Sequence, residues 1–294
     1  MPMAIAIIAS ALAGSGVLAA VARKWQLPTR EAAALIMLAS AGASALVAWL
    51  AAGNVLRPAA LPPAFCAAQL SLFVGGILLR FYRDPERMPP PDPCAILSPA
   101  DGTVAYLRRL TPGAVLQAEK KGRAMGLTEL QETPLAREEL WQIGISMVFT
   151  DVHVNRAPIA GRIVMVRRRP GLFLSLRRQE AASANERQTV VLERDGVPVA
   201  VVQIASRLVR RIRAFVGEGE QVERGQRIGA ITFGSQVDLF VPLRLCPKVL
   251  VAPGQHVTAG QTAVGRLSMG RESQMGGDEA GDCGERATWT AGAW

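Results

Sequence analysis

The sequence has few of the residues from which several common kinds of site are built. It contains only two histidines and four cysteines, and the cysteines form no C-x-x-C pair. Metal centres depend on clusters of such side chains, so we expect no metal site. Aromatic residues make up 5% of the chain, which leaves few surfaces on which the bases of a single-stranded nucleic acid could stack.

Charge is missing from three long stretches near the N-terminus. Residues 3–22, 32–53 and 58–79 contain no charged side chain, and about 20 apolar residues suffice to cross the hydrocarbon core as a helix. We therefore predict a membrane anchor over residues 1–82, with three transmembrane helices and a two-helix arrangement as the alternative. No basic segment precedes the first stretch, which argues against a secretory signal peptide.

The basic residues near these stretches predict the orientation of the anchor. They occur in the first loop and after the third stretch, at Arg23, Lys24, Arg30, Arg80, Arg83 and Arg87. The second loop carries only Arg57. Because basic loops remain in the cytoplasm, we expect a protein of the inner cell membrane whose polar domain faces the cytoplasm. The basic residues follow the membrane boundary and not one aromatic-rich stripe, so we expect no nucleic-acid partner.

The composition changes after the third apolar stretch. Residues 83–97 are charged and proline-rich, so they cannot continue a helix and are predicted to form a linker. Residues 98–267 contain short β-branched runs separated by glycine, a pattern typical of strands and turns. Residues 268–294 show no periodicity and are rich in Gly, Glu, Asp and Ser, which predicts a disordered tail.

Short internal repeats indicate how the strand-rich part is built. The pattern G-x-x-V-x-x-G-Q occurs at residues 219–226 and again at residues 254–261, and residues 99–104 weakly echo residues 159–164. Hairpin units with such glycines recur in lipoyl- and biotinyl-type barrel-sandwich folds. The predicted fold class is therefore N-terminal transmembrane helices followed by a β-rich, barrel-sandwich-like α+β domain. A carrier function is disfavoured, because a carrier needs a lysine at such a hairpin tip and none occurs between Gly225 and Val241.

Three short segments carry residues suited to catalysis. His153 ends a strand-like run and leads into an X-Pro turn, and it is one of two histidines available for acid–base chemistry near neutral pH. Asp101 lies in the sequence S-P-A-D-G. Gly234 precedes Ser235 between two strand-like runs, and because glycine has no Cβ, a neighbouring hydroxyl can reach its carbonyl carbon. Taken alone, each of these segments is typical of an ordinary turn. The other histidine, His256, lies in the second G-x-x-V-x-x-G-Q segment and is expected at the surface.

Six segments together occur in the order typical of one family. They are R-D-P-E-R (83–87), S-P-A-D-G (98–102), D-V-H-V-N-R-A-P (151–158), N-E-R (185–187), R-R-I (210–212) and F-G-S-Q-V-D (233–238). Over roughly residues 60–265 the chain resembles the short bacterial form of the phosphatidylserine decarboxylase family. No single segment would be specific enough, but their shared order is.

The resemblance implies an enzyme that processes itself. Ser235 would be the nucleophile, His153 its base, and Asp101 the carboxylate that orients the imidazole. Cleavage between Gly234 and Ser235 would leave a β chain and an α chain that remain together as a heterodimer. Ser235 would become a pyruvoyl group, a covalent cofactor whose carbonyl acts as an electron sink.

The resemblance also implies a membrane phospholipid substrate, phosphatidylserine, and its conversion to phosphatidylethanolamine. Arg156, Arg210 and Arg211 are candidates for binding the phosphate, because the guanidinium presents a planar fork of donors. Arg156 stands where longer members of the family have a second histidine. Two alternatives stay open: a pyruvoyl decarboxylase of another amino-acid headgroup, and a non-catalytic, membrane-tethered barrel-sandwich module. A homo-oligomer is left open as well.

Overall fold

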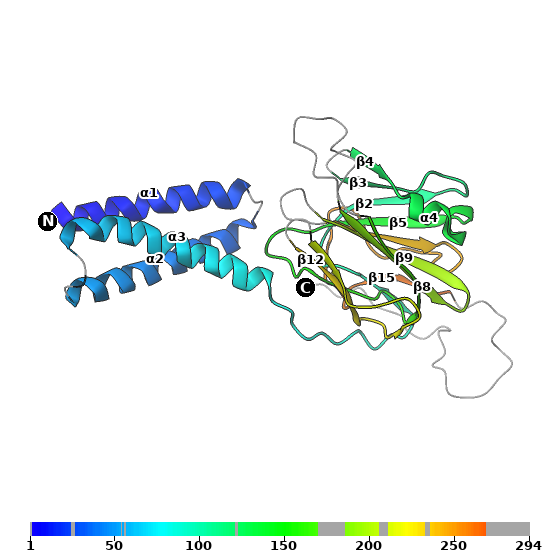
Figure 1. Ribbon diagram of the computed structural model, residues 1–294. Coiled ribbons are helices and arrows are strands. Elements are labelled where there is room, and N and C mark those ends of the chain that lie inside the picture. The colour runs from blue at the N-terminus through cyan, green and yellow to red at the C-terminus, as the bar shows by residue number, and fades with distance from the viewer. Residues whose placement is uncertain are drawn as a thin grey trace, which may run out of the picture. The chain divides into compact units, whose positions relative to one another are not determined.

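A computed structural model describes residues 2–24, 27–53, 55, 57–120, 123–169, 186–205, 211–232 and 236–268. The chain separates into two compact units, one formed by Met1–Pro85 with Val148–His153 and the other by Glu86–Met147 with Val154–Trp294. Helices make up the first unit and strands dominate the second (Figure 1). The predicted fold class, apolar N-terminal helices followed by a β-rich α+β domain, is confirmed.

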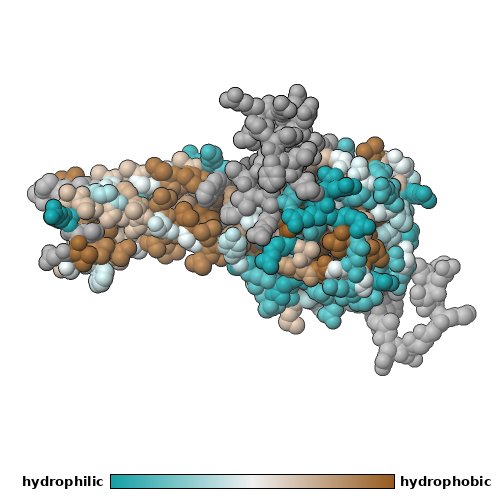
Figure 2. Space-filling view, in the orientation of Figure 1, coloured by the Kyte–Doolittle hydropathy of each residue, from teal (hydrophilic) through white to brown (hydrophobic). Residues whose placement is uncertain are grey.

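The helical unit contains three long helices. They are α1 (Pro2–Lys24), α2 (Thr29–Ala52) and α3 (Leu61–Phe81), with the 3-10 turn η1 (Pro58–Ala60) before α3. All three are long and apolar enough to cross a membrane, and apolar residues cover most of their surface in Figure 2. Helix α3 ends at Phe81, three residues before Asp84. Asp84 precedes Pro85, and the residue before a proline disfavours the helical conformation.

One polar cluster joins the three helices. Gln69 of α3 is 1% exposed, and its Nε2 donates to Ser15 Oγ of α1 at 3.0 Å and to Ser40 Oγ of α2 at 2.8 Å. A Cβ at Gly14 would lie 2.1 Å from the Gln69 side-chain oxygen, so a larger residue at this position would displace the Gln69 amide. Small residues and interhelical hydrogen bonds of this kind hold helices together in hydrocarbon, where the hydrophobic effect gives no preference for helix contacts.

The strand-rich unit is built on a sheet of eight strands in the order β11-β7-β8-β9-β13-β5-β2-β14. Each pairing in it is antiparallel. The strands are β2 (Gly102–Leu110), β5 (Leu140–Ser146), β7 (Gly161–Arg169), β8 (Arg187–Arg194), β9 (Val197–Ile204), β11 (Gln221–Val222), β13 (Gln236–Pro242) and β14 (His256–Val257).

Smaller elements cover this sheet. A three-stranded sheet has the order β10-β12-β6, and β1 pairs with β15 and β3 with β4. Their bounds are β1 (Ala95–Leu97), β3 (Gln117–Lys120), β4 (Arg123–Gly126), β6 (Val154–Arg156), β10 (Arg211–Ala214), β12 (Arg227–Thr232) and β15 (Ala263–Arg266). The turn-length helices α4 (Thr128–Gln131) and η2 (Pro134–Arg137) follow β4.

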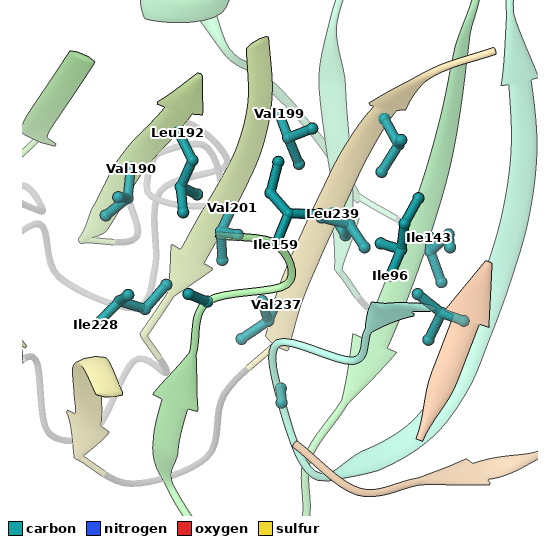
Figure 3. Close-up of a cluster of buried hydrophobic side chains, with 14 of the residues drawn as sticks. Ile96, Ile143, Ile159, Val190, Leu192, Val199, Val201, Ile228, Val237 and Leu239 are labelled. Carbon is teal, nitrogen blue, oxygen red and sulfur yellow. The ribbon is translucent and has the colours of Figure 1, made fainter. Parts of the chain in front are cut away.

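Both faces of the large sheet are buried. On one face, residues such as Val201, Leu239 and Ile143 pack with Ile96 of β1 and Ile228 of β12 in the larger core, which Figure 3 shows. On the other face, a second cluster lies against β3, β4, α4 and η2. Strand β9 is buried at every position, so its sequence V-P-V-A-V-V-Q-I lacks the alternation of a strand with one wet face.

The order of the large sheet is symmetrical about the boundary between β9 and β13. At one edge Val222 of β11 lies opposite Gly161 of β7, and at the other Val257 of β14 lies opposite Gly102 of β2. The turn after each short edge strand contains a glycine with positive φ. The repeated G-x-x-V-x-x-G-Q segments therefore occupy equivalent places in two halves of one domain.

The two halves are nested. Strands β6 to β12 form one half, which is inserted between β5 and β13 of the other. The sequence similarity between residues 99–104 and 159–164 aligns Gly102 with Arg162. The edge pairs make Gly102 equivalent to Gly161 instead, a difference of one residue. The chain crosses between the halves twice, at residues 147–153 and at residues 233–235, and these crossings contain the predicted base and the predicted nucleophile.

Candidate active site

Asp101 is held in a buried ion pair just before β2. Its side chain is 7% exposed and that of Arg87 is 8% exposed. The guanidinium donates Nη1–H to Oδ1 at 2.5 Å and Nη2–H to Oδ2 at 2.8 Å, and the Ala259 backbone N–H donates to Oδ1 at 2.8 Å. A Cβ at the next residue, Gly102, would lie 2.3 Å from the Ser146 carbonyl oxygen. Bidentate pairing and this close backbone packing together set the orientation of the carboxylate.

Hydrogen bonds join the S-P-A-D-G segment to β6. The Pro99 carbonyl oxygen accepts from the Arg156 backbone N–H at 2.9 Å and from Asn155 Nδ2 at 3.3 Å. Asn155 Oδ1 in turn accepts from Gln203 Nε2 at 2.8 Å, and both side chains are fully buried. Two of the six sequence segments are thus adjacent in the strand-rich unit, and a buried amide chain ties them to β9.

The structure describes only part of the set of three arginines predicted to bind substrate. Arg156 is 3% exposed and donates from Nη1 to the Gly225 carbonyl at 3.0 Å. A Cβ at Gly260 would lie 2.7 Å from Arg156 Cδ, so this side chain lies between the turns of the two repeats. Arg211 begins β10, which pairs with the end of β12, and Arg210 lies outside the described residues. The role of all three in substrate binding stays a prediction.

His153 ends the loop Val148–His153, which belongs to the helical unit. It is 3% exposed, and its Nδ1 lies 2.8 Å from the Asp151 carbonyl oxygen. Because a carbonyl oxygen only accepts, Nδ1 carries the hydrogen in this bond and Nε2 is the nitrogen that can take up a proton. The Asp151 carboxylate accepts from the Val148 N–H at 2.7 Å, which closes the loop on itself. His256 is exposed on β14, as expected.

The predicted cleavage site, Gly234–Ser235, lies outside the described residues. Strand β12 ends at Thr232 and β13 begins at Gln236. Gln236 pairs with Ser146 of β5 on one side and with the end of β9 on the other. The strand that follows Ser235 is therefore hydrogen-bonded on both sides from its first residue.

A buried carboxylate, Asp238, lies further along β13. It is fully buried and accepts hydrogen bonds from Tyr106 Oη at 2.5 Å, Gln142 Nε2 at 2.7 Å and Gln236 Nε2 at 2.7 Å. Gly144 lies between Tyr106 and Asp238 in the register of the sheet, and a Cβ there would lie 2.4 Å from the Tyr106 ring. Burial raises the pKa of Asp238 to about 6, although the three donors oppose it.

Arg87 and Asp238 were not predicted as parts of the site. Arg87 lies in the R-D-P-E-R segment, where the sequence indicates only a basic charge that follows the third apolar stretch. It also donates to the carbonyl oxygen of Ala259, 172 positions along the chain, and no local pattern reveals such a partner. Asp238 did give a signal, because an aspartate inside the run V-D-L-F-V is unusual for a buried strand.

The apolar helices and the buried polar groups of the strand-rich unit define a membrane-associated enzyme. A sequence profile of the phosphatidylserine decarboxylase family matches residues 74–265. The chain belongs to the phosphatidylserine decarboxylase family, and it is a decarboxylating enzyme, a lyase. The resemblance inferred from the six segments is thereby confirmed, and the non-catalytic module is set aside.

Relatives named phosphatidylserine decarboxylase proenzyme cover most of the chain. The protein of Erythrobacter litoralis is 40% identical over 74% of this chain and 86% of its own length. That of Novosphingobium aromaticivorans is 38% identical over 83% of this chain and 88% of its own. That of Trichlorobacter lovleyi is 40% identical over 76% of this chain and 90% of its own.

Proposed function

We propose that the chain is a proenzyme that cuts its own backbone between Gly234 and Ser235 and then converts phosphatidylserine into phosphatidylethanolamine. Family membership and relatives named as proenzymes support the proposal. The observation that carries the proposal is that the strands flanking the two crossings pair with each other, β5 with β13 and β6 with β12. His153 and Ser235 each lie in one of these crossings.

Strand register supports bringing the two crossings together. The first crossing runs from β5 of the large sheet to β6 of the small sheet, and the second runs back from β12 to β13. At the large sheet Ser146 at the end of β5 pairs with Gln236 at the start of β13. At the small sheet Val154 at the start of β6 pairs with Ala230 of β12. The strands that flank the two crossings are therefore paired with each other at both sheets.

The proposed self-cleavage needs a nucleophile, a base and a group that orients the base. Ser235 Oγ attacks the Gly234 carbonyl carbon while His153 Nε2 accepts its proton, and the peptide becomes an ester with a free Ser235 amine. Elimination removes the Ser235 α-proton, breaks its Cβ–Oγ bond and releases the Gly234 carboxylate. Water then displaces ammonia from the dehydroalanine. In this proposal the Asp101 carboxylate would stabilise the charge of the imidazolium, because the Nδ1–H bond of the ring goes to the Asp151 carbonyl.

The residues after Ser235 fit a pyruvoyl group at a new N-terminus. Gln236 is 4% exposed, and its side chain donates to the Glu119 carbonyl at 2.7 Å and to Tyr106 Oη at 2.9 Å. A chain end one residue before this anchor keeps its position after cleavage. The pyruvoyl carbonyl would supply an electron sink when carbon dioxide leaves. Because β13 pairs with β5 and β9, the cleaved chains would also remain associated as a heterodimer.

The proposed substrate is a phospholipid with a serine headgroup. Its headgroup offers a primary amine and a carboxylate on one carbon, and its phosphate calls for a cation such as Arg156, Arg210 or Arg211. The test is carbon dioxide release from phosphatidylserine in detergent micelles, compared with free serine at equal concentration. Release from the lipid at the higher kcat/KM supports the proposal. Equal or faster turnover of free serine, or no release from the lipid, removes the lipid assignment.

A further inference from the structure

The loop that carries His153 is part of the helical unit. Its Phe149 packs on the apolar cluster formed by the helices, which includes Leu18, Ala22, Leu27, Ala32, Ala39, Phe73 and Ile77. Phe81, the last residue of α3, is 3% exposed. Its ring centroid lies 6.4 Å from that of Phe149 and 4.1 Å from that of the His153 imidazole, with an angle of 37° between the planes of Phe81 and His153.

These contacts restrain the imidazole on two sides. The Asp151 carbonyl oxygen, 2.8 Å from Nδ1, fixes which ring nitrogen carries the hydrogen. The Phe81 ring covers a face of the imidazole, so it limits rotation of His153 about its side-chain bonds. Phe149 holds the start of the same short loop against the helices. The direction of Nε2 therefore depends on the last residue of a membrane-length helix.

We propose that Phe81 is a positioning residue for His153, so that the third membrane helix takes part in self-cleavage and not only in anchoring. This inference rests on the proposed role of His153 as the base. A base must point at the proton it removes, and a displacement of about 1 Å can slow a reaction by about a hundredfold. Loss of the Phe81 ring lets the imidazole turn away from that direction. We expect self-cleavage to slow by about tenfold or more.

The experiment follows the conversion of full-length proenzyme to cleaved chains in membranes after a pulse of synthesis. Phe81→Ala is compared with Phe81→Tyr, which keeps the ring, and with Phe73→Ala. Phe73 is a matched control because it lies on the same helix as Phe81, is 1% exposed, and belongs to the apolar cluster on which Phe149 packs. We expect the Phe81→Ala chain to be cleaved about tenfold more slowly than wild type, with the other two variants within about twofold of wild type.

Cleavage of the wild-type chain tests the proposed function, and the comparison among the variants tests the role of Phe81. If wild type is cleaved and Phe81→Ala is cleaved as fast as Phe73→Ala, Phe81 does not position the base. If Phe81→Tyr is as slow as Phe81→Ala, the ring is not what matters and the inference is overturned as well. If wild type is never cleaved before Ser235, the proposed function fails and the inference falls with it.

Discussion

At the scale of single residues, the pair of Asp101 and Arg87 depends on burial for its strength. A carboxylate taken out of water is stable only with a partner, and removal of one member of such a pair costs about 3–5 kcal/mol. We therefore expect Arg87→Ala to destabilise the strand-rich unit by about this amount and to slow self-cleavage. Thermal unfolding of the uncleaved Ser235→Ala background measures the first effect, and the rate of chain cleavage in the otherwise native protein measures the second.

A matched control for this variant is Arg244→Ala. Arg244 makes an equally bidentate pair with Glu138, at 2.7 Å and 2.9 Å, but its side chain is 54% exposed. An exposed pair contributes about 1 kcal/mol or less, so this variant is expected to resemble wild type in both measurements. Equal effects of the two substitutions would show that burial of the Asp101 pair has no special role.

The buried carboxyl of Asp238 predicts a pH dependence of stability. Its pKa is raised from 3.8 to about 6 in the folded protein, so the folded state binds the proton more strongly than the unfolded state. The contribution of this group to stability is therefore largest below about pH 4, falls as the pH rises to about 6, and is constant above, a change of up to about 3 kcal/mol. The Tm of wild type minus the Tm of Asp238→Asn should therefore increase as the pH falls from 6 to 4. A difference for Asp238→Asn that stays constant over this pH range, or that narrows at low pH, would show that burial does not control this carboxyl.

At the scale of elements, the packing of the three apolar helices is expected to depend on Gln69. Its hydrogen bonds to Ser15 and Ser40 join all three helices, and an interhelical hydrogen bond in hydrocarbon contributes about 0.6–2 kcal/mol. Gln69→Ala should lower the thermal stability of the helical unit in detergent by about 1–2 kcal/mol. Ser44→Ala is the control, because Ser44 donates only within α2, to the Ser40 carbonyl at 2.8 Å. A Gln69→Ala variant as stable as Ser44→Ala would argue against the cluster.

Most of these elements were predictable, and the exceptions have physical reasons. The three helices follow from uncharged stretches of membrane length, and the paired repeat turns follow from the spacing of Gly219, Gly225, Gly254 and Gly260, all of which have positive φ. The one-residue shift of the weaker echo was not predictable, because strand register is decided by long-range pairing. The nesting of the two halves likewise depends on contacts far apart in the sequence. The polar row of Tyr106, Gly144 and Asp238 joins three different strands.

At the scale of the whole molecule, the helices predict an integral membrane protein. Salt at 1 M shortens the Debye length to about 3 Å and weakens surface attraction, but it does not weaken burial of apolar helices in the bilayer. The protein should therefore stay in the membrane pellet after a wash with 1 M salt and leave it only in detergent. Release by salt alone would indicate a peripheral protein.

The proposed orientation places the strand-rich unit in the cytoplasm. The orientation is predicted from basic residues, two of which form ion pairs, Arg80 with Glu31 and Arg87 with Asp101. The prediction therefore depends mainly on the basic residues of the first loop. A protease added outside intact spheroplasts should leave the strand-rich unit uncut, whereas disrupted cells should lose it. Digestion in intact spheroplasts would reverse the orientation.

The central claim is that the backbone is cut before Ser235, and the intact mass of the purified protein tests it most directly. Wild type should give two chains, residues 1–234 and residues 235–294, and the smaller chain should begin with a pyruvoyl group in place of serine and so resist Edman sequencing. Ser235→Ala should give one chain of 31.3 kDa, apart from the single-oxygen difference of the substitution. A single uncut chain from wild-type protein that releases carbon dioxide from phosphatidylserine would contradict the claim.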